Sequence, residues 1–411
     1  MSCIDFQLDC NPCITRYTYK VIPRRLEPKL RELARYYPVV AVTGPRQSGK
    51  TTLCKKVFPK KAYVSLEALD VRDYARTDPR GFFTEYKKGA IIDEVQHVPE
   101  LLSYLQGEVD NQPESGRFIL TGSQHFGLSQ SIAQSLAGRC GILVLLPLSL
   151  DELSQFKTSP DELYQVLWQG AYPRIYDRKI PPHQWLADYV TTYIQRDVRQ
   201  LVNVSDLQAF SGFLKLCAGR TAQELNASKL SNDAGVSHNT VRAWLSVLEA
   251  SYIIHRLPAW CTNVRKQVVK APKIHFIDSG LACYLLGITE PQQLRHHPQR
   301  GAIFESWVVS ELFKNLVHRG KPANLFHYRE ARGLEIDLII EAGQQLHAVE
   351  IKSAETIASD AFTNLQRFIH RLTETKDSRT LTSTLIYGGE ESQRRTHAKV
   401  TSWRQVNSLK I

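Results

Sequence analysis

The chain has 411 residues, of which 43% are hydrophobic and 23% charged. At about 100 to 200 residues per domain, this length predicts two to four domains and excludes a single small module, while the composition excludes a disordered or collagen-like chain. Lysine and arginine outnumber the acidic residues by 52 to 41, and the net charge of +11 is compatible with a polyanionic partner such as nucleic acid.

Nothing in the chain predicts membrane insertion or secretion. The longest nearly unbroken apolar run, residues 141–150, is about half of the roughly 20 residues that cross a bilayer. Residues 1–17 lack the basic start and apolar core of a signal peptide. Cys10 and Cys13 are the one close cysteine pair, with no second pair at zinc-ligand spacing. We therefore expect a cytoplasmic protein with free thiols and no membrane partner.

The first part of the chain predicts a leader followed by an α/β domain. Residues 1–36 are basic and irregular and end in a helical run, Lys29–Tyr36. Over residues 37–150, short β-rich runs alternate with helical or loop stretches, which predicts a parallel sheet with helices on both faces. The expected strands are Val39–Thr43, Ala62–Ser65, Ala90–Asp93, Phe118–Thr121 and Ile142–Leu146.

A complete match to G-x-x-x-x-G-K-[ST] stands between the first expected strand and a helix. The backbone N–H groups of such a loop and the positive end of the helix bind the β-phosphate of a nucleotide. We expect Lys50 to reach the β- and γ-phosphates and Thr51 to bind Mg²⁺. The residues expected to contact ATP are Gly44, Pro45, Arg46, Gln47, Ser48, Gly49, Lys50, Thr51 and Thr52.

Polar residues follow two later strands of the same domain. Asp93 and Glu94 end one apolar strand, so Asp93 is expected to hold Mg²⁺ and Glu94 to polarise the attacking water. Ser123 follows the next strand. Because ligands of open α/β sheets sit at the carboxyl ends of the strands, Ser123 or the following Gln124 is expected to face the γ-phosphate.

Residues 37–150 therefore resemble the AAA+ class of P-loop ATPases, in which a polar sensor follows the strand after the two acids. In that class an arginine near the end of the next helix is often offered to the ATP of a neighbouring subunit. The resemblance implies this role for Arg139, and with it a homo-oligomer; a structural ion pair is the alternative. Arg174, Arg196 and Arg199 are candidates for a second sensor arginine.

The middle of the chain predicts a helical lid or connector over residues 151–205 and a winged helix-turn-helix over residues 206–286. Leu230 and Ala234 are expected to pack inward, Gly235 to form the turn and Ser237 to cap the second helix.

The expected second helix places polar residues where they can contact DNA. Asn and Arg side chains can bond base edges in the major groove, and a basic run at residues 263–270 predicts a wing on phosphate. The alternative is a helix-turn-helix that serves only packing or protein contacts. The candidate DNA-binding residues are His238, Asn239, Thr240, Arg242, Arg265 and Lys266.

After a turn-rich linker at residues 287–300, residues 301–411 predict a second α/β unit. Strand alternation puts Glu335 and Asp337 on one face, and Glu350 beside Lys352 on the next strand. If the two strands pair as a hairpin, Asp337 and Glu350 can hold a divalent cation while Lys352 activates a water. Glu305, on the preceding helix, is a further candidate metal ligand.

This arrangement is similar to the restriction-endonuclease-like PD-(D/E)xK pattern, with Ile336 where the fullest form of the pattern has proline. Folds of this kind also serve as inactive binding domains. The sequence therefore leaves open both a nuclease site and a non-cleaving domain.

The run Lys270–Ala282, the P-loop and the Glu-Ile-Lys strand together resemble a prokaryotic family of ATP-binding proteins with an AAA-like domain followed by a DUF4143 domain. The resemblance implies an α/β protein: a P-loop AAA+-like parallel sheet domain, a helical winged-helix region and a restriction-endonuclease-like α/β domain. It also implies a bacterial or archaeal cytoplasm.

The sequence favours an AAA+-type ATPase that couples its nucleotide state to DNA binding, with ATP and Mg²⁺ as cofactors. One alternative is an ATP-controlled, metal-dependent DNA endonuclease. A second alternative is a signalling or scaffold ATPase whose helix-turn-helix binds a protein.

Overall fold

The computed structural model describes residues 21–123, 134–194, 206–261, 271–330, 333–374 and 379–409. Several residues named above lie outside these ranges, as does the whole run 263–270 that was expected to form a wing: Cys10, Cys13, Gln124, Arg196, Arg199, Arg265, Lys266 and Lys270. In the described ranges, none of the helices combines the length and apolar character that a membrane span requires.

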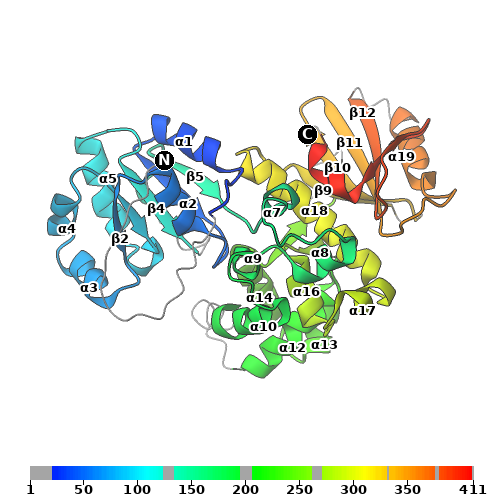
Figure 1. The fold of residues 1–411 in the computed structure, drawn as a ribbon, viewed down its shortest axis with the longest axis horizontal. Helices are drawn as coiled ribbons and strands as arrows, with labels where there is room; N and C mark the ends of the chain where they lie inside the picture. The colour runs from blue at the N-terminus through cyan, green and yellow to red at the C-terminus, as the bar shows by residue number, and fades with distance from the viewer. Residues whose placement is uncertain are drawn as a thin grey trace.

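The described chain forms three units that meet along one long helix (Figure 1). A five-stranded sheet lies at the N-terminal end, a helical region follows, and a six-stranded sheet ends the chain. Helix α18 (Arg300–His318) contacts a strand from each of the three sheets. Thirteen of its residues are buried, so it is a shared core element of the three units.

The first sheet is parallel throughout, with strand order β2-β3-β4-β1-β5. Every residue of β1 is fully buried, as expected for a strand covered by helices on both faces. The strands are β1 (Val39–Thr43), β2 (Ala62–Ser65), β3 (Ala90–Asp93), β4 (Phe118–Gly122) and β5 (Cys140–Val144). The helices of this unit are α1 (Glu27–Tyr36), α2 (Lys50–Val57), α3 (Leu69–Thr77), α4 (Pro79–Glu85) and α5 (Leu101–Asn111).

The expected parallel sheet is confirmed, with one shift in its last strand. The strand β5 begins two residues before the expected Ile142 because Cys140 pairs with Val39 at the start of β1. The chain leaves the sheet after Val144, and Leu145 and Leu146 are buried outside the strand.

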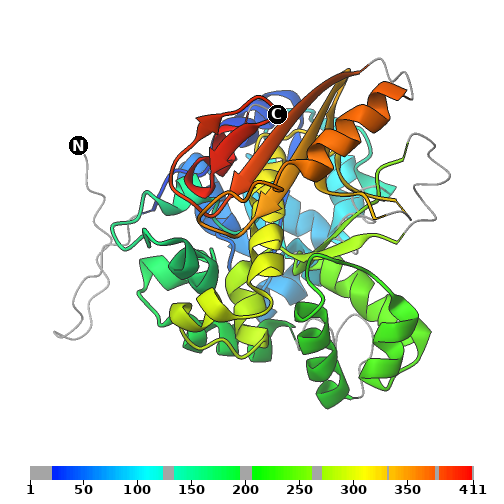
Figure 2. The ribbon, with the colours of Figure 1, turned by 90° about the vertical axis from the view of Figure 1, so that its right-hand side faces the viewer.

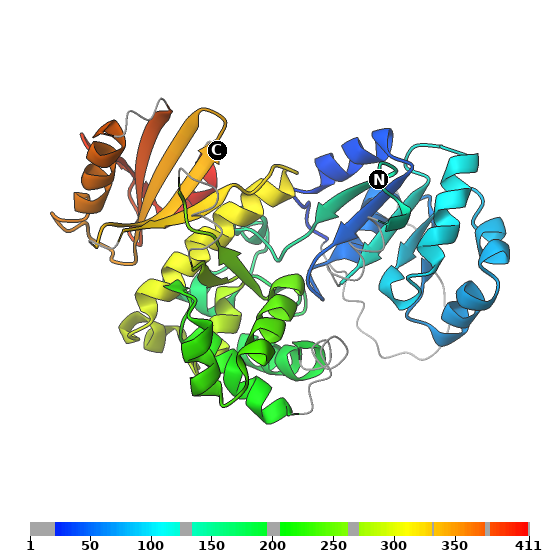
Figure 3. The ribbon, with the colours of Figure 1, turned by 180° about the vertical axis from the view of Figure 1, so that it is seen from behind.

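The middle region is mainly helical but contains a small antiparallel sheet of order β6-β8-β7. All three strands lie within residues 206–286, the segment expected to be a winged helix-turn-helix, and β6 and β7 are short strands that pair with β8 later in the chain. Figure 3 shows the green helices of this region below the two larger sheets. The strands are β6 (Gln223–Glu224), β7 (Ile254–Leu257) and β8 (Lys273–Phe276).

The helices of this region run from residue 150 to residue 296. A single π-helical turn at Val190–Ile194 follows α10, and α17 lies inside the segment expected to be a linker. Pro291 starts α17, and Leu294 is fully buried, which ties the segment to the core. The helices are α7 (Leu150–Leu153), α8 (Leu163–Gln169), α9 (Pro173–Asp177), α10 (Pro182–Tyr189), α12 (Leu207–Ala218), α13 (Ala227–Ala234), α14 (His238–Ala250), α16 (Ser279–Leu285) and α17 (Pro291–His296).

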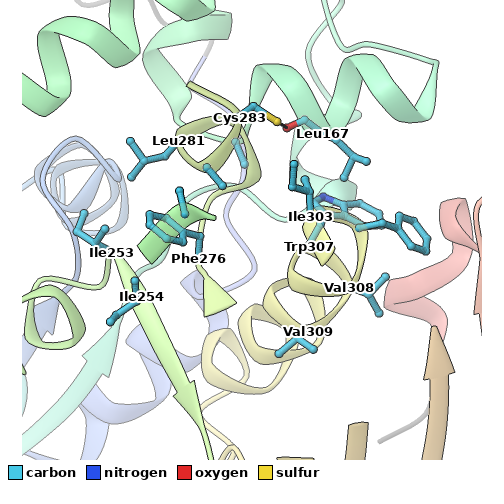
Figure 4. Close-up of a cluster of buried hydrophobic side chains, with 14 of the residues drawn as sticks. Leu167, Ile253, Ile254, Phe276, Leu281, Cys283, Ile303, Trp307, Val308 and Val309 are labelled. Atoms are coloured by element: carbon cyan, nitrogen blue, oxygen red, sulfur yellow. Dashed lines mark hydrogen bonds between the residues drawn. The ribbon is translucent and has the colours of Figure 1, made fainter. Parts of the chain in front are cut away.

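A continuous hydrophobic core joins the middle region to α18 (Figure 4). Leu167 on α8, Phe276 on β8 and Trp307 on α18 belong to the same buried cluster. The Cys283 thiol on α16 lies 3.8 Å from the carbonyl oxygen of Leu167. Because one close-packed cluster spans these elements, the middle region and α18 form one structural body.

The C-terminal sheet has the order β13-β14-β12-β11-β10-β9. The two strands pair as a hairpin, the arrangement that the expected metal site requires: β10 and β11 run antiparallel, with Leu338 opposite Val349. Leu338 packs in the cluster that contains α18, whereas Ile339 packs against α19 (Thr363–Glu374), so the sheet lies between two helices (Figure 2). The strands are β9 (Leu325–Arg329), β10 (Glu335–Ala342), β11 (Gln345–Lys352), β12 (Thr380–Tyr387), β13 (Gln393–Arg394) and β14 (Lys399–Ser402).

Candidate functional site

The P-loop leaves the carboxyl end of β1 and enters α2 at Gly49. Gly49 has φ +95° and Gly44 has φ +144°, both in a region that residues with a Cβ rarely adopt. A Cβ at Gly44 would lie 2.1 Å from the carbonyl oxygen of Leu145. The loop can therefore pack this closely against the chain after β5 only with glycine at position 44.

Lys50 closes the loop on itself. The side chain is buried, and Nζ donates to the carbonyl oxygens of Gly44 and Pro45 at 3.0 and 2.9 Å. Burial lowers the pKa of the ammonium group, while Glu94 and Asp93 favour its charged form. Ser48 is fully buried, and its Oγ has no hydrogen-bond partner among the described residues. The Lys50 ammonium group thus lies within the P-loop, whose backbone groups are expected to surround a phosphate.

Asp93, at the end of β3, accepts hydrogen bonds from three hydroxyl groups. Thr51 Oγ1 lies 2.9 and 3.1 Å from its two carboxylate oxygens, Tyr63 OH lies 2.8 Å from Oδ2, and the Thr121 hydroxyl bonds Oδ1. Burial, the hydrogen bond to Asp93 and the charge of Asp93 raise the pKa of Tyr63 to about 12. The predicted Mg²⁺ ligands Thr51 and Asp93 are thus in contact, and their oxygens are of the type that Mg²⁺ prefers.

Glu94 stands in an unusual backbone conformation with φ +56°. The hydroxyl of Ser123 donates to its Oε2 at 3.3 Å, and the amide of Gln96 donates to the same oxygen. Gln96 Nε2 also lies 3.1 Å from Ser123 Oγ. A non-glycine residue at positive φ adopts a backbone conformation that costs free energy. Such conformations often occur at functional sites, and Glu94 lies beside the P-loop. The structure brings Ser123 to Glu94, and Gln96, which we did not predict, holds both.

A pocket of about 530 Å³ opens between the P-loop and the helical region. Arg174, one of the candidate sensor arginines, lines it from α9 together with Arg178. Thr52 is exposed at its edge, and Gln47 reaches it at φ +64°. The apolar residues lining this pocket, none of them predicted, are Val21, Ile22, Leu53, Leu148, Phe156 and Pro173.

Arg24, in the segment expected to be a leader, is the main site residue that sequence analysis missed. Its guanidinium donates to the carbonyl oxygens of Ser48 at 2.7 Å and Leu146 at 2.8 Å. Its Nε lies 3.0 Å from Glu152 Oε1, and both side chains are buried. Arg24 therefore fixes the P-loop to the helical region, and Ile22, Leu26 and Leu30 of the same segment are buried in the core.

The predicted arginine finger is bound elsewhere. Arg139 donates to both carboxylate oxygens of Asp110, at 2.5 and 3.0 Å. The N–H of Val39 donates to the Arg139 carbonyl, which places Arg139 beside the amino end of β1. The P-loop leaves the opposite end of that strand. Within the chain, Arg139 thus forms the structural ion pair that was the alternative reading.

The helix-turn-helix pair has the predicted local geometry. Gly235 has φ +67°, and Ser237 Oγ accepts from the N–H of Thr240 at 3.1 Å, as a cap of α14. His238, Asn239 and Arg242 are exposed and Thr240 is half-buried, while the apolar face of both helices packs in the core. The inward-facing residues are Leu230, Val241, Leu245 and Leu248.

The described part of the Lys270–Ala282 run, from residue 271 on, stabilises the fold. Asp278 is buried, caps α16 by accepting the N–H of Leu281 at 2.9 Å, and accepts the N–H of Ala171 at 2.7 Å. Cβ atoms at Gly170 and Gly280 would collide with their surroundings at 2.3 and 2.6 Å. The two glycines and the aspartate therefore lock α16 against the chain after α8.

The predicted acidic residues of the C-terminal unit meet a lysine from the middle region. We call Glu305, Glu335, Asp337 and Glu350 the acid cluster. Lys273, at the start of β8, lies with Nζ 2.9 Å from Glu305 Oε1 and 2.7 Å from Glu335 Oε1. Burial and the charge of Asp337 raise the pKa of Glu305 to about 8 and that of Glu350 to about 7.

The other two acids of the cluster have partners on β11. Asp337 Oδ2 accepts the N–H of Ile351 at 2.8 Å, and Lys352 Nζ lies 2.6 Å from Glu350 Oε1. Among the residues the structure describes, no three metal-ligating side chains are grouped so as to hold a metal. The expected metal site at Asp337, Glu350 and Glu305 is not formed in this arrangement, because ammonium and backbone N–H groups engage these carboxylates.

Three family models match consecutive parts of the chain. Residues 36–154 match an AAA domain, residues 160–292 a domain of unknown function, DUF8612, and residues 300–406 another domain of unknown function, DUF4143. The chain therefore carries an AAA domain and a C-terminal DUF4143 domain, as the sequence motifs indicate.

Two curated relatives are the uncharacterized proteins Mb2031c of Mycobacterium bovis and Rv2008c of Mycobacterium tuberculosis. Each is 29% identical over 331 residues, which is 80% of this chain and 73% of the relative. Among solved structures, the Walker-type ATPase paby2304 of Pyrococcus abyssi is similar with 15% identity and a TM-score of 0.44 over 63% of this chain and 94% of that chain. RuvB of Thermotoga maritima is similar with 18% identity and a TM-score of 0.31 over 58% and 90%.

Proposed function

We propose that the chain binds and hydrolyses ATP at the P-loop and that its nucleotide state governs DNA binding by the helix-turn-helix. The ATP step is carried by one observation: Lys50, Thr51, Asp93 and Glu94 converge in a single pocket at the carboxyl ends of β1 and β3. The match of residues 36–154 to an AAA domain supports the same assignment.

Each residue of the pocket has a role that its position supports. The N–H groups of the P-loop and Lys50 would bind the phosphates. Thr51 and Asp93 would hold Mg²⁺, which supplies positive charge to the phosphate oxygens. Glu94 would orient the attacking water, with Ser123 and Gln96 setting the position of its carboxylate. The guanidinium of Arg174 would offer positive charge from the helical side of the pocket.

ATP turnover and nucleotide affinity, measured separately, test this proposal. We expect Lys50→Ala to lose both, whereas Glu94→Gln keeps nucleotide affinity and loses turnover, because the amide cannot accept a proton from water. Lys60→Ala, an exposed lysine beyond α2, is the matched control and should behave as wild type. Wild-type turnover in Glu94→Gln would contradict its assigned role, and unchanged affinity in Lys50→Ala would contradict the site.

Coupling to DNA is supported by a contact between the helix-turn-helix unit and the P-loop strand. Tyr252, which follows α14, is buried with its hydroxyl 3.1 Å from Thr43 Oγ1. Thr43 is the last residue of β1, directly before the loop. A shift of the P-loop on nucleotide binding would thus reach the unit that presents Asn239 and Arg242 to solvent.

ATP turnover with and without double-stranded DNA tests the coupling. We expect DNA to stimulate turnover in wild type, and affinity for DNA to fall steeply as salt rises, because phosphate contacts release counterions. The double variant Asn239→Ala, Arg242→Ala should bind DNA more weakly and keep the ATP turnover that wild type shows without DNA. Arg80→Ala, at an exposed arginine on α4, is the control. DNA-independent turnover with no salt-dependent affinity would favour the scaffold ATPase with a protein partner.

A further inference from the structure

A lysine from one unit is inserted into the acid cluster of another. Lys273 begins β8 in the middle region, and its side chain is 3% exposed. Its Nζ bonds Glu305 on α18 and Glu335 on β10 at 2.9 and 2.7 Å. A buried ammonium group is retained only where carboxylates compensate the loss of hydration, and two of them do so here.

The cluster contains more carboxyl groups than its own unit supplies with cationic partners. From the C-terminal unit, the four carboxyl groups meet Lys352, which bonds Glu350, and Arg329, whose Nε lies 4.0 Å from Glu335 Oε2. The Lys273 ammonium enters this cluster from the middle region and bonds Glu305 and Glu335. The second oxygen of Glu350, Oε2, is buried without a hydrogen-bond partner among the described residues. The cluster is therefore a cation site, and Lys273 supplies the cation.

The same position would have to hold the divalent cation of a nuclease. A divalent ion bound to Glu305 and Asp337 would lie beside the Lys273 ammonium in a buried setting, where like charges repel strongly. Carboxylates that already bond an ammonium or a backbone N–H offer it fewer free oxygens. The residues present thus do not fit the metal that a restriction-endonuclease-like domain would require.

We propose that Lys273 is the resident cation of the acid cluster: it fastens the small sheet β6-β8-β7 to the C-terminal unit and excludes a divalent metal, so that the folded chain does not cleave DNA. The lysine takes the metal's place as a fixed counter-ion. Its removal should turn the cluster into a site for Mn²⁺ or Mg²⁺.

Mn²⁺ titration of the full chain without nucleotide, followed by electron paramagnetic resonance of free Mn²⁺, tests this. Wild type and Asp337→Asn should bind the same number of Mn²⁺ ions, because neither has a metal at the cluster. Lys273→Met should bind one more ion than wild type. The double variant that carries both Lys273→Met and Asp337→Asn should not bind this additional ion. Lys273→Arg, which keeps the positive charge, and Lys229→Met, an exposed lysine on α13, should both match wild type.

Two results would overturn the proposal. One is a wild-type chain that binds one Mn²⁺ more than Asp337→Asn, or that cuts supercoiled plasmid with Mg²⁺ or Mn²⁺ in a reaction that Asp337→Asn abolishes. The other is Lys273→Met that retains the wild-type far-UV circular dichroism but gains no ion. If Lys273→Met does not fold, the comparison of wild type with Asp337→Asn still shows whether the acid cluster binds a metal ion. ATP turnover depends on the P-loop, so these outcomes do not bear on the proposed ATPase.

Discussion

Glu152→Gln is the most informative single substitution, because Glu152 joins the P-loop to the helical region. The carboxylate is fully buried, 3.0 Å from Arg24 Nε, and accepts the N–H groups of Arg25 and Ser149 at 2.7 and 2.9 Å. Glutamine keeps the size of the side chain and loses its charge. Arg24 would then remain buried without its carboxylate while still holding the Ser48 carbonyl.

The expected loss of stability in Glu152→Gln follows from the pKa of Glu152 in the folded chain. Burial raises its pKa, but Arg24, His318 and the two N–H groups lower it by more, from 4.5 to about 2. At about 1.4 kcal/mol per pKa unit, ionisation of Glu152 contributes about 3 kcal/mol to the free energy of unfolding. Breaking a buried pair by removing one partner costs about 3 to 5 kcal/mol, which agrees with this value.

The sign of the pH dependence is fixed by the direction of the shift. The pKa of Glu152 is lower in the folded chain than in the unfolded chain. Its contribution to the free energy of unfolding is therefore complete above pH 4.5 and is lost as the pH falls from 4.5 towards 2. Urea unfolding followed by tryptophan fluorescence measures the difference between wild type and Glu152→Gln. All six tryptophans lie from Trp168 to Trp403, so the fluorescence reports on the helical and C-terminal units.

We expect Glu152→Gln to unfold at a lower urea concentration than wild type at pH 7. The difference between the two urea midpoints should become smaller below pH 4.5. Glu391→Gln, an exposed glutamate, should match wild type at every pH. Equal midpoints at pH 7, or a gap that stays constant down to pH 3.5, would refute the buried-pair argument.

Three further substitutions test the fold around the sites. Gly44→Ala should abolish nucleotide binding, measured by equilibrium titration, because its Cβ would lie 2.1 Å from a backbone oxygen; Gly107→Ala, with nothing within 4 Å, should bind as wild type. Ser237→Ala should lower stability by about 1 kcal/mol in urea unfolding, through loss of the α14 cap. Trp244→Ala should cost about 3 to 5 kcal/mol in the same assay, since its indole is buried against two phenylalanines.

Each of these expectations has a result that contradicts it. Wild-type nucleotide affinity in Gly44→Ala would show that the loop tolerates a side chain there. Full stability of Ser237→Ala would show that the cap contributes nothing; Ser228→Ala, at an exposed serine on α13, is the control. A Trp244→Ala loss below 1 kcal/mol would show that the core collapses around the deletion.

Local sequence determined those parts of the protein whose residues are close along the chain. The P-loop needs glycine at positions 44 and 49 and a helix at Lys50, and all lie within seven residues. The turn at Gly235 and the cap at Ser237 are likewise local, and the side-chain alternation predicted the strands β10 and β11. Backbone conformation and side-chain periodicity depend on neighbours in sequence, so these features could be predicted.

Only the tertiary structure decided which distant residues complete the sites. Arg24 meets Glu152 across 128 positions of sequence, and Lys273 enters a cluster built by α18 and β10. Tyr252 reaches Thr43 from the end of α14. Such pairs leave no local pattern, because they depend on how whole units pack. The same packing brings the Lys273 ammonium to Glu305, one of the predicted metal ligands, because a buried carboxylate needs a nearby positive charge.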